Sequence, residues 1–164
     1  MSSTNASPSA FGWDFQVNAG IVLLLMNIGE AESVKIEGTT EDVEITFANG
    51  QKVFAQAKSI FDPDDTSHAI DKLEGALKTL NNASTSPEAE RLVYVTNSPN
   101  PFNDVKTMTA FTGSCAYLPY ANLPQVCKDR IDTICTRQRH TLPRNNLAVL
   151  VSISGVTERT AIVL

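Results

Sequence analysis

Three polar side chains on two adjacent predicted strands could together support phosphodiester hydrolysis. They are Asp42, Gln56 and Lys58. A carboxylate and an amide oxygen are ligands that a hard cation such as Mg²⁺ accepts. An ammonium group beside them can help to deprotonate a water molecule or stabilise a phosphorane-like transition state. A metal, a water molecule and a cationic side chain are the minimum set for this reaction.

The pairing of the two strands decides whether these side chains meet. Residues 42–47 and residues 52–58 alternate polar and apolar side chains, which is typical of strands with one buried face. Asn49-Gly50 between them provides turn chemistry. We therefore predict a β-hairpin.

The apolar residues favour one register of this hairpin. A two-residue turn would place Val43 opposite Gln56 and mix the polar and apolar faces. A three-residue loop over 48–50, with its glycine in the left-handed conformation, instead places Val43 opposite Ala55. The same register sets Asp42 beside Gln56, and the lysine follows two residues further along the strand.

A surface without chemistry is the alternative interpretation. An Asp at a strand start and a Lys at a strand end commonly form an exposed ion pair worth about 0–1 kcal/mol. If helices cover both faces of the sheet, however, a row of Gln and Lys is costly to bury without a purpose. Glu37, at the end of the preceding strand, could be a further ligand or an outer partner of a metal site.

Hydrophobic periodicity predicts the elements that would position these residues. Helices are expected over 12–28, 69–82 and 123–139, and strands over 33–37, 42–47, 52–58, 91–96 and 147–153, with a further candidate strand over 160–164. Residues 102–119 suggest only a short helix and an irregular stretch. This order predicts an α/β fold with a mixed central sheet flanked by helices.

Length and composition are those of one globular domain. The chain has 164 residues, of which 42% are hydrophobic and 19% charged, and these fractions exclude wholesale disorder and a coiled coil. Residues 1–10 are expected to be a flexible leader, and residues 11–164 the domain. The longest strongly apolar stretch, residues 21–26, is much shorter than the roughly 20 residues of a membrane span, so no membrane partner is expected.

Several common site patterns are missing from the sequence. The three cysteines form no Cys-x-x-Cys pair and only two histidines occur, so a structural zinc site or a disulfide framework is not expected, and a reducing cytoplasm fits best. Neither a Gly-x-x-x-x-Gly-Lys-Ser/Thr loop nor a Gly-x-Gly-x-x-Gly pattern occurs, so nucleotide-driven activity is not predicted.

Charge is distributed unevenly along the chain. Residues 1–104 carry 6 Lys/Arg and 15 Asp/Glu, whereas residues 105–164 carry 7 and 3. Basic side chains around the last predicted helix are candidate contacts to a DNA backbone. These candidates are Lys128, Arg137, Arg139 and Arg144. An ordinary exposed helix face explains them equally well.

Four short motifs resemble those of a nuclease superfamily. They are Gly12-Trp13-Asp14-Phe15-Gln16, Glu37-Gly38-Thr39-Thr40-Glu41-Asp42-Val43, Gln56-Ala57-Lys58 and Thr96-Asn97. With the predicted element order, they resemble the PD-(D/E)XK nucleases, particularly the branch with Gln in the third position, such as Mrr-like restriction endonucleases. The sequence is most similar to the N-terminal endonuclease domains of bacterial antiphage effectors of the CBASS type.

The resemblance implies a restriction-endonuclease-like αβββαβ core and a metal-dependent endonuclease that cuts double-stranded DNA with low sequence specificity. Asp42 would be the central ligand of Mg²⁺ or Mn²⁺, Gln56 the second ligand and Lys58 the catalytic lysine. Gln16 occupies a helix position where many relatives carry Glu, and Glu41 would support the site. With Gln at two positions, the metal would meet less negative charge than in most relatives.

The resemblance also implies a biological setting. Such a domain would act in the bacterial cytoplasm and form a homo-oligomer on activation, because cutting a duplex takes two active sites. The chain ends within the apolar run 161–164, which suggests a longer protein with a C-terminal sensor or regulatory domain. Two alternatives stay open: a catalytically inactive nuclease-fold module that binds DNA or a partner protein, and an unrelated α/β domain that serves protein assembly.

Overall fold

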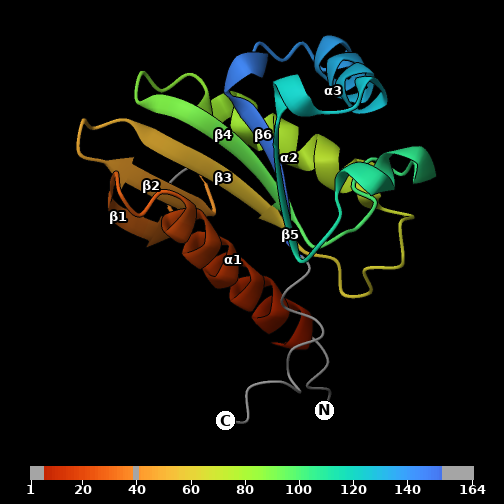
Figure 1. The fold of residues 1–164 in the computed structure, drawn as a ribbon, viewed down its shortest axis with the longest axis horizontal. Coiled ribbons are helices and arrows are strands. Elements are labelled where there is room, and N and C mark those ends of the chain that lie inside the picture. Colours follow the sequence, from red (N-terminus) through yellow and green to blue (C-terminus); the bar gives the residue numbers. More distant parts are fainter. Residues whose placement is uncertain (1–5, 39–40, 153–164) are drawn as a thin grey trace.

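A mixed six-stranded sheet forms the centre of the computed structural model, which describes residues 6–38 and 41–152 (Figure 1). The principal elements are α1 (Ala6–Met26), β1 (Ala31–Ile36), β2 (Val43–Phe47), β3 (Lys52–Lys58), α2 (Ala69–Ala83), β4 (Ala89–Thr96), β5 (Cys115–Pro119), α3 (Gln125–Arg137) and β6 (Leu147–Ser152). Short 3-10 turns cover Val105–Ala110, Tyr120–Asn122 and Arg144–Asn146. The predicted α/β class with a mixed sheet and flanking helices is confirmed.

The strands lie in the order β1-β2-β3-β4-β6-β5. The first three form an antiparallel meander, β4 and β6 run parallel to β3, and β5 is an antiparallel edge strand. The parallel pair β3 and β4 needs a crossover connection, and α2 provides it.

The register of the β2–β3 hairpin confirms the three-residue loop. Val43 pairs with Ala55, and the Phe47 N–H donates to the Gln51 carbonyl at 2.9 Å. Gly50 closes the loop with a φ of 81°, a left-handed conformation that glycine adopts without a steric cost. The apolar residues of both strands therefore share one face, as their alternation predicts.

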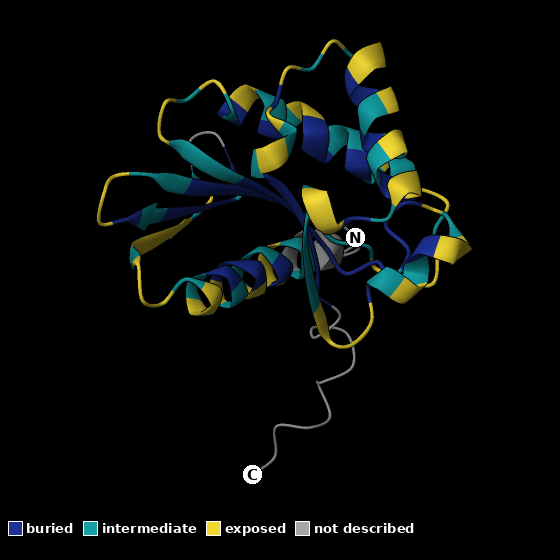
Figure 2. Cartoon of the chain, turned by 45° about the horizontal axis from the view of Figure 1, so that its top comes forward, coloured by how far each residue is buried: buried dark blue, intermediate teal, exposed yellow. Residues whose placement is uncertain are grey.

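Two hydrophobic clusters pack on opposite faces of the sheet. α1 covers one face with Phe15, Ala19 and Leu23, and α2 and α3 cover the other. Figure 2 shows the buried strands between these helical layers. Along β3, Ala55 faces α1 whereas Phe54 faces α2. Gln56 therefore also lies on the α2 face, since alternate residues of a strand share a face.

The structure differs from the predicted elements at three places. α1 begins at Ala6, within the segment expected to be a flexible leader; Pro8 lies in its first turn, where proline costs no hydrogen bond. β5 lies within residues 102–119, for which no strand was predicted. The candidate strand over 160–164 lies outside the described residues. None of the described helices is long and apolar enough to cross a membrane.

Candidate functional site

The side chains of Asp42 and Gln56 are in direct contact. Gln56 donates a hydrogen bond from Nε2 to Oδ2 of Asp42, and the backbone N–H of Ala57 donates to the same oxygen at 2.9 Å. Asp42 immediately precedes β2, and the confirmed register places it opposite Gln56. The hydrogen bond uses the amide nitrogen of Gln56 and leaves the amide oxygen as a candidate ligand.

Lys58 belongs to the same group. It ends β3 two residues after Gln56, so both side chains project from the same face. Its positive charge lowers the pKa of Asp42 and of Glu41. The structure therefore brings together Asp42, Gln56 and Lys58, as the hairpin register predicts.

Burial dominates the electrostatics of Asp42. Loss of solvent raises the pKa of this carboxyl. The Ala57 N–H, the charge of Lys58 and the Gln56 amide lower the pKa, and the charge of Glu37 raises it. A cation close to the carboxylate would oppose the effect of burial, because it favours the charged form.

Glu41 is more deeply buried than its predicted supporting role suggests. Its side chain is 3% exposed, and neither of its carboxylate oxygens has a hydrogen-bond partner among the described residues. Burial raises its pKa to about 8, with further increases from the charges of Asp42 and Glu44. A buried carboxylate without donors is costly unless it is protonated or paired with a cation. In the sequence, the three acidic residues at positions 41, 42 and 44 are the signal for the charges that raise the pKa of Glu41.

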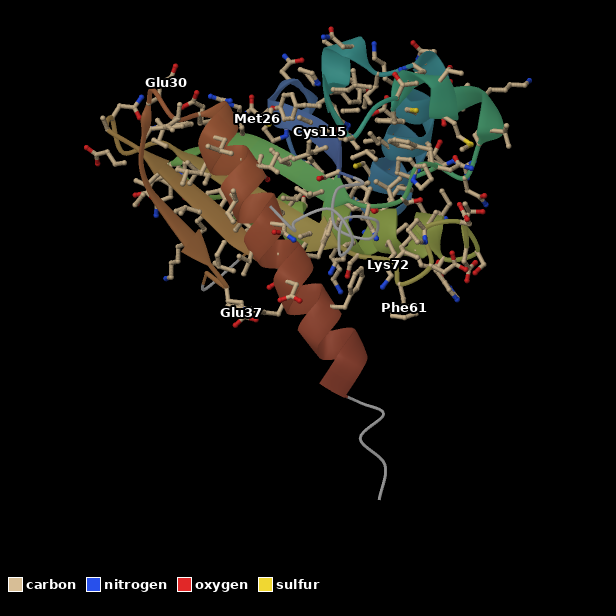
Figure 3. All side chains as sticks on the ribbon, turned by 60° about the horizontal axis from the view of Figure 1, so that its bottom comes forward. Met26, Glu30, Glu37, Phe61, Lys72 and Cys115 are labelled. Carbon is tan, nitrogen blue, oxygen red and sulfur yellow. The ribbon has the colours of Figure 1, made fainter. Side chains whose placement is uncertain are left out.

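Glu37 lies at the edge of the site. Its side chain is exposed, its φ is 51°, and its N–H donates to the Asp42 carbonyl at 2.7 Å, which closes the β1–β2 connection. Figure 3 shows Glu37 at the end of the sheet near α1. Glu44 is buried, and a Cβ on Gly38 would overlap its carboxylate. Only a glycine fits at position 38 without a shift of that carboxylate.

Gln16 approaches the same end of the sheet from α1. It lies on one stripe of the helix between Gly12, which faces Ser59, and Gly20, which packs closely against Ile36. Because Ile36 ends β1 and Ser59 follows β3, Gln16 lies over this end of the sheet on its α1 face, whereas Gln56 lies on the α2 face. Its Oε1 atom is buried without a hydrogen-bond partner in the described part of the chain.

Asn97 fixes the chain just beyond Lys58. Its Oδ1 accepts a hydrogen bond from the Ile60 N–H and its Nδ2 donates to the Ile60 carbonyl, both at 2.7 Å. Asn97 follows β4 and is fully buried, so it ties the segment after β3 to the end of the neighbouring strand. The sequence resemblance marked Asn97 without a role, and its contacts show that it holds the segment after β3 in place.

The basic residues predicted to contact DNA lie elsewhere. Arg144 lies just before β6, and the first residue of β6 pairs with Leu92 near the start of β4. Lys58 instead pairs with Thr96 at the opposite end of β4. Three of the four side chains also have internal partners: Arg137 pairs with Glu74, Arg144 with Asp132 at 2.8 Å, and Lys128 with the Ala121 carbonyl at 2.9 Å. Arg139 is exposed beyond α3. The structure does not bring this group to Asp42.

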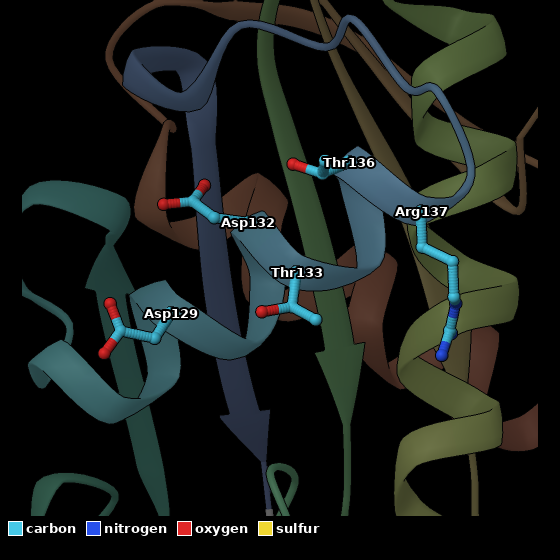
Figure 4. A pocket seen from close by; sticks show the side chains of 5 residues that line it. All are labelled: Asp129, Asp132, Thr133, Thr136 and Arg137. Carbon is cyan, nitrogen blue, oxygen red and sulfur yellow. The ribbon is translucent and has the colours of Figure 1, made fainter.

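A hollow lies on the outer surface of α3 (Figure 4). It is lined by Asp129, Asp132, Thr133, Thr136 and Arg137, all from one helix. Two of its charged groups already pair, Asp132 with Arg144 and Arg137 with Glu74. The hollow therefore offers no converging set of reactive groups.

The candidate metal ligands around Asp42 are oxygen atoms, which suits a hard cation such as Mg²⁺. The carboxylate oxygens of Glu41, which have no hydrogen-bond donor in the described part of the chain, are consistent with such a cation. No cluster of three or more His, Cys, Asp or Glu side chains within residues 6–38 and 41–152 could hold a metal ion. A metal there would therefore depend on amide oxygens, water or substrate to complete its coordination.

Comparisons with known proteins assign no family to the chain. No protein-family model matches it, and neither a curated protein nor a solved structure matches it.

Proposed function

We propose that the chain is a metal-dependent endonuclease domain that hydrolyses phosphodiester bonds of double-stranded DNA with low sequence specificity. The observation that carries this proposal is the contact between Asp42 and Gln56 with Lys58 on the same strand face. The order α1-β1-β2-β3-α2-β4, with β3 parallel to β4, is consistent with a restriction-endonuclease-like core.

Each residue of the site has a distinct role in this proposal. Asp42 and the amide oxygen of Gln56 would hold Mg²⁺ or Mn²⁺, which when bound would lower the pKa of a ligand water and offset phosphate charge. The Gln56 amide nitrogen and the Ala57 N–H orient the Asp42 carboxylate. Lys58 would stabilise negative charge that develops on the phosphate oxygens.

Glu41 and Glu37 complete the surroundings of this site. Glu41 supplies a buried carboxylate whose oxygens have no donors in the described structure. Glu37, at the exposed edge, could contribute to the site through a water molecule. Because Gln replaces a carboxylate at positions 16 and 56, we expect weak metal affinity that a DNA phosphate improves.

A second candidate function is a catalytically inactive module that binds DNA or a partner protein. One observation favours it: no cluster of three or more His, Cys, Asp or Glu side chains that could hold a metal ion occurs within the described residues. Such a module would bind DNA with an affinity that falls with salt, yet would never nick it.

Supercoiled plasmid DNA distinguishes the two functions. Titration with Mg²⁺ and Mn²⁺ should produce nicked and then linear plasmid, and chelation by EDTA should abolish both products. DNA binding without nicking at any concentration of either ion would support the inactive module and contradict the nuclease. We further propose that the domain is the effector part of a bacterial cytoplasmic antiphage protein whose sensor domain is not in this chain.

A further inference from the structure

A row of apolar residues lies on the side of α1 that faces away from the sheet, with the exposed polar residues Asp14 and Asn18 beside it. Opposite its buried side lies a row that we name the outer stripe: Trp13, Val17, Ile21 and Leu25 on α1, and Ile28 in the turn that follows. The exposed fractions of Trp13, Ile21, Leu25 and Ile28 range from 45% to 71%. Figure 1 shows α1 as the outermost layer on its face of the sheet.

The composition of α1 is that of a helix buried on all sides. Asp14 is its only charged residue, and no basic residue lies in its last turn. Helices that are apolar all round are normally covered on every side. Half of α1 is covered by the sheet, so its outer half requires a second covering surface.

We propose that the outer stripe is the interface with a second copy of this chain. The exposed fractions correspond to roughly 450 Å² of apolar surface, within the range of about 300–600 Å² that is often functional on soluble proteins. A standard interface buries about 800 Å² per partner, of which roughly 57% is non-polar. The outer stripe therefore supplies the apolar part of one such interface.

The geometry of the outer stripe is self-complementary. Trp13, Val17, Ile21 and Leu25 follow one another at intervals of four residues, so they form a single ridge, and two such ridges interlock at about −50°. A two-fold axis places the same patch on both partners and brings residues near the axis against their own copies. Ile21, near the middle of the stripe, should lie at that axis.

Charge argues against a membrane surface as the partner of the outer stripe. Helices that lie on membranes depend on Lys and Arg along their polar face, and α1 has neither. The chain has a net charge of −5, so two copies repel each other over most of their surface. The five residues of the outer stripe carry no charge, and Asp14 is the one charged residue beside them on α1. The repulsion between two copies should therefore oppose contact least at this stripe.

The mass of the chain in solution tests the proposal without DNA or metal. Sedimentation velocity should give twice the 17.8 kDa of one chain, and Ile21→Glu and Leu25→Glu should each return the mass to that of one chain. Val126→Glu, at an exposed apolar position on α3, is the matched control and should stay dimeric. Far-UV circular dichroism checks that each variant is folded.

Disulfide trapping locates the two-fold axis. Cys127 and Cys135 are buried, so Cys115→Ser removes the exposed thiol. In that background, Ile21→Cys should form a linked dimer under mild oxidation, whereas Val126→Cys should not. A wild-type monomer at the highest soluble concentration would overturn the proposal, including the case in which residues 153–164 of the same chain cover the stripe. A dimer that survives both glutamate substitutions would overturn it as well.

Discussion

The Gln56 amide donates a hydrogen bond to the Asp42 carboxylate from the neighbouring strand. The adjoining Ala57 N–H donates to the same oxygen, so β3 holds this carboxylate through both a side chain and its backbone. The contact depends on the hairpin register, because a slip of one residue would turn Gln56 to the opposite face.

Gly50→Ala should destabilise the protein. The left-handed φ of 81° at Gly50 has a steric cost for alanine, and we expect a loss of about 1 kcal/mol or more in the free energy of unfolding by urea. Gly75→Ala is the matched control: Gly75 lies within α2 with nothing within 4 Å of an added Cβ, so a gain of about 0.5–1 kcal/mol is expected. Equal effects at both glycines would contradict the proposed role of the turn.

Gln56→Glu should strengthen metal binding and lower the thermal stability of the metal-free protein. The change supplies a carboxylate in place of the amide, but it removes the donor to Asp42 and adds a third acid beside Asp42 and Glu41. The thermal midpoint should therefore fall in EDTA and rise more than in the wild type on addition of Mn²⁺. Gln51→Glu, in the same hairpin, should change neither value. A variant that responds to Mn²⁺ no more than the wild type would argue against a metal at this position.

Glu41→Gln should change how stability depends on pH. The pKa of Glu41 is raised from 4.5 to about 8 in the folded chain, so between these values the folded state binds more protons than the unfolded state. Stability conferred by the protonated carboxyl is thus lost as the pH rises from about 5 to about 8. In chelator, the variant should lack this decline and be more stable at pH 8, by a margin on the order of 3 kcal/mol.

Urea unfolding across this pH range measures the Glu41 effect. Glu30→Gln removes an exposed acid and should leave the pH slope of the wild type unchanged. A slope that is the same in the wild type and in Glu41→Gln would show that this carboxyl titrates normally.

Asn97→Ala should affect both stability and cleavage. It leaves the N–H and carbonyl of Ile60 without their partners, at a cost of about 2–3 kcal/mol. It also releases the segment that follows Lys58, so DNA cleavage should fall about 10- to 100-fold at temperatures where the variant is folded.

Asn81→Ala is the control for this effect. Asn81 accepts hydrogen bonds from the N–H groups of Thr141 and Leu142, far from Asp42. Asn81→Ala should reduce stability about as much as Asn97→Ala does and leave DNA cleavage unchanged. Parallel losses of cleavage in both variants would assign the effect to stability alone.

The sequence predicted the parts of the fold in which one strong pattern dominates. Strict alternation and a left-handed glycine determine the β2–β3 hairpin, and the register then places Asp42 against Gln56 without further information. β5 was missed because its five residues end in Pro119, which argues against a central strand but is tolerated at a sheet edge.

Contacts between residues that are far apart in the chain could not be predicted from the sequence pattern. The engagement of Arg137 by Glu74, which lies on another helix, cannot be read from the spacing of charges along the last helix. Likewise, the burial of Glu41, whose side chain is 3% exposed, depends on tertiary packing. Local periodicity carries no record of such packing.

Cleavage of supercoiled plasmid by Lys58→Ala, compared with Lys52→Ala, tests the central claim most directly. Both lysines lie on the same face of β3, but Lys52 forms a partly exposed pair with Glu88 at 3.0 Å at the other end of the strand. We expect Mg²⁺-dependent nicking to fall about 100-fold or more in Lys58→Ala, because a cation beside the reacting phosphate is lost, and to persist in Lys52→Ala. Full nicking by folded Lys58→Ala would contradict the assignment of this site.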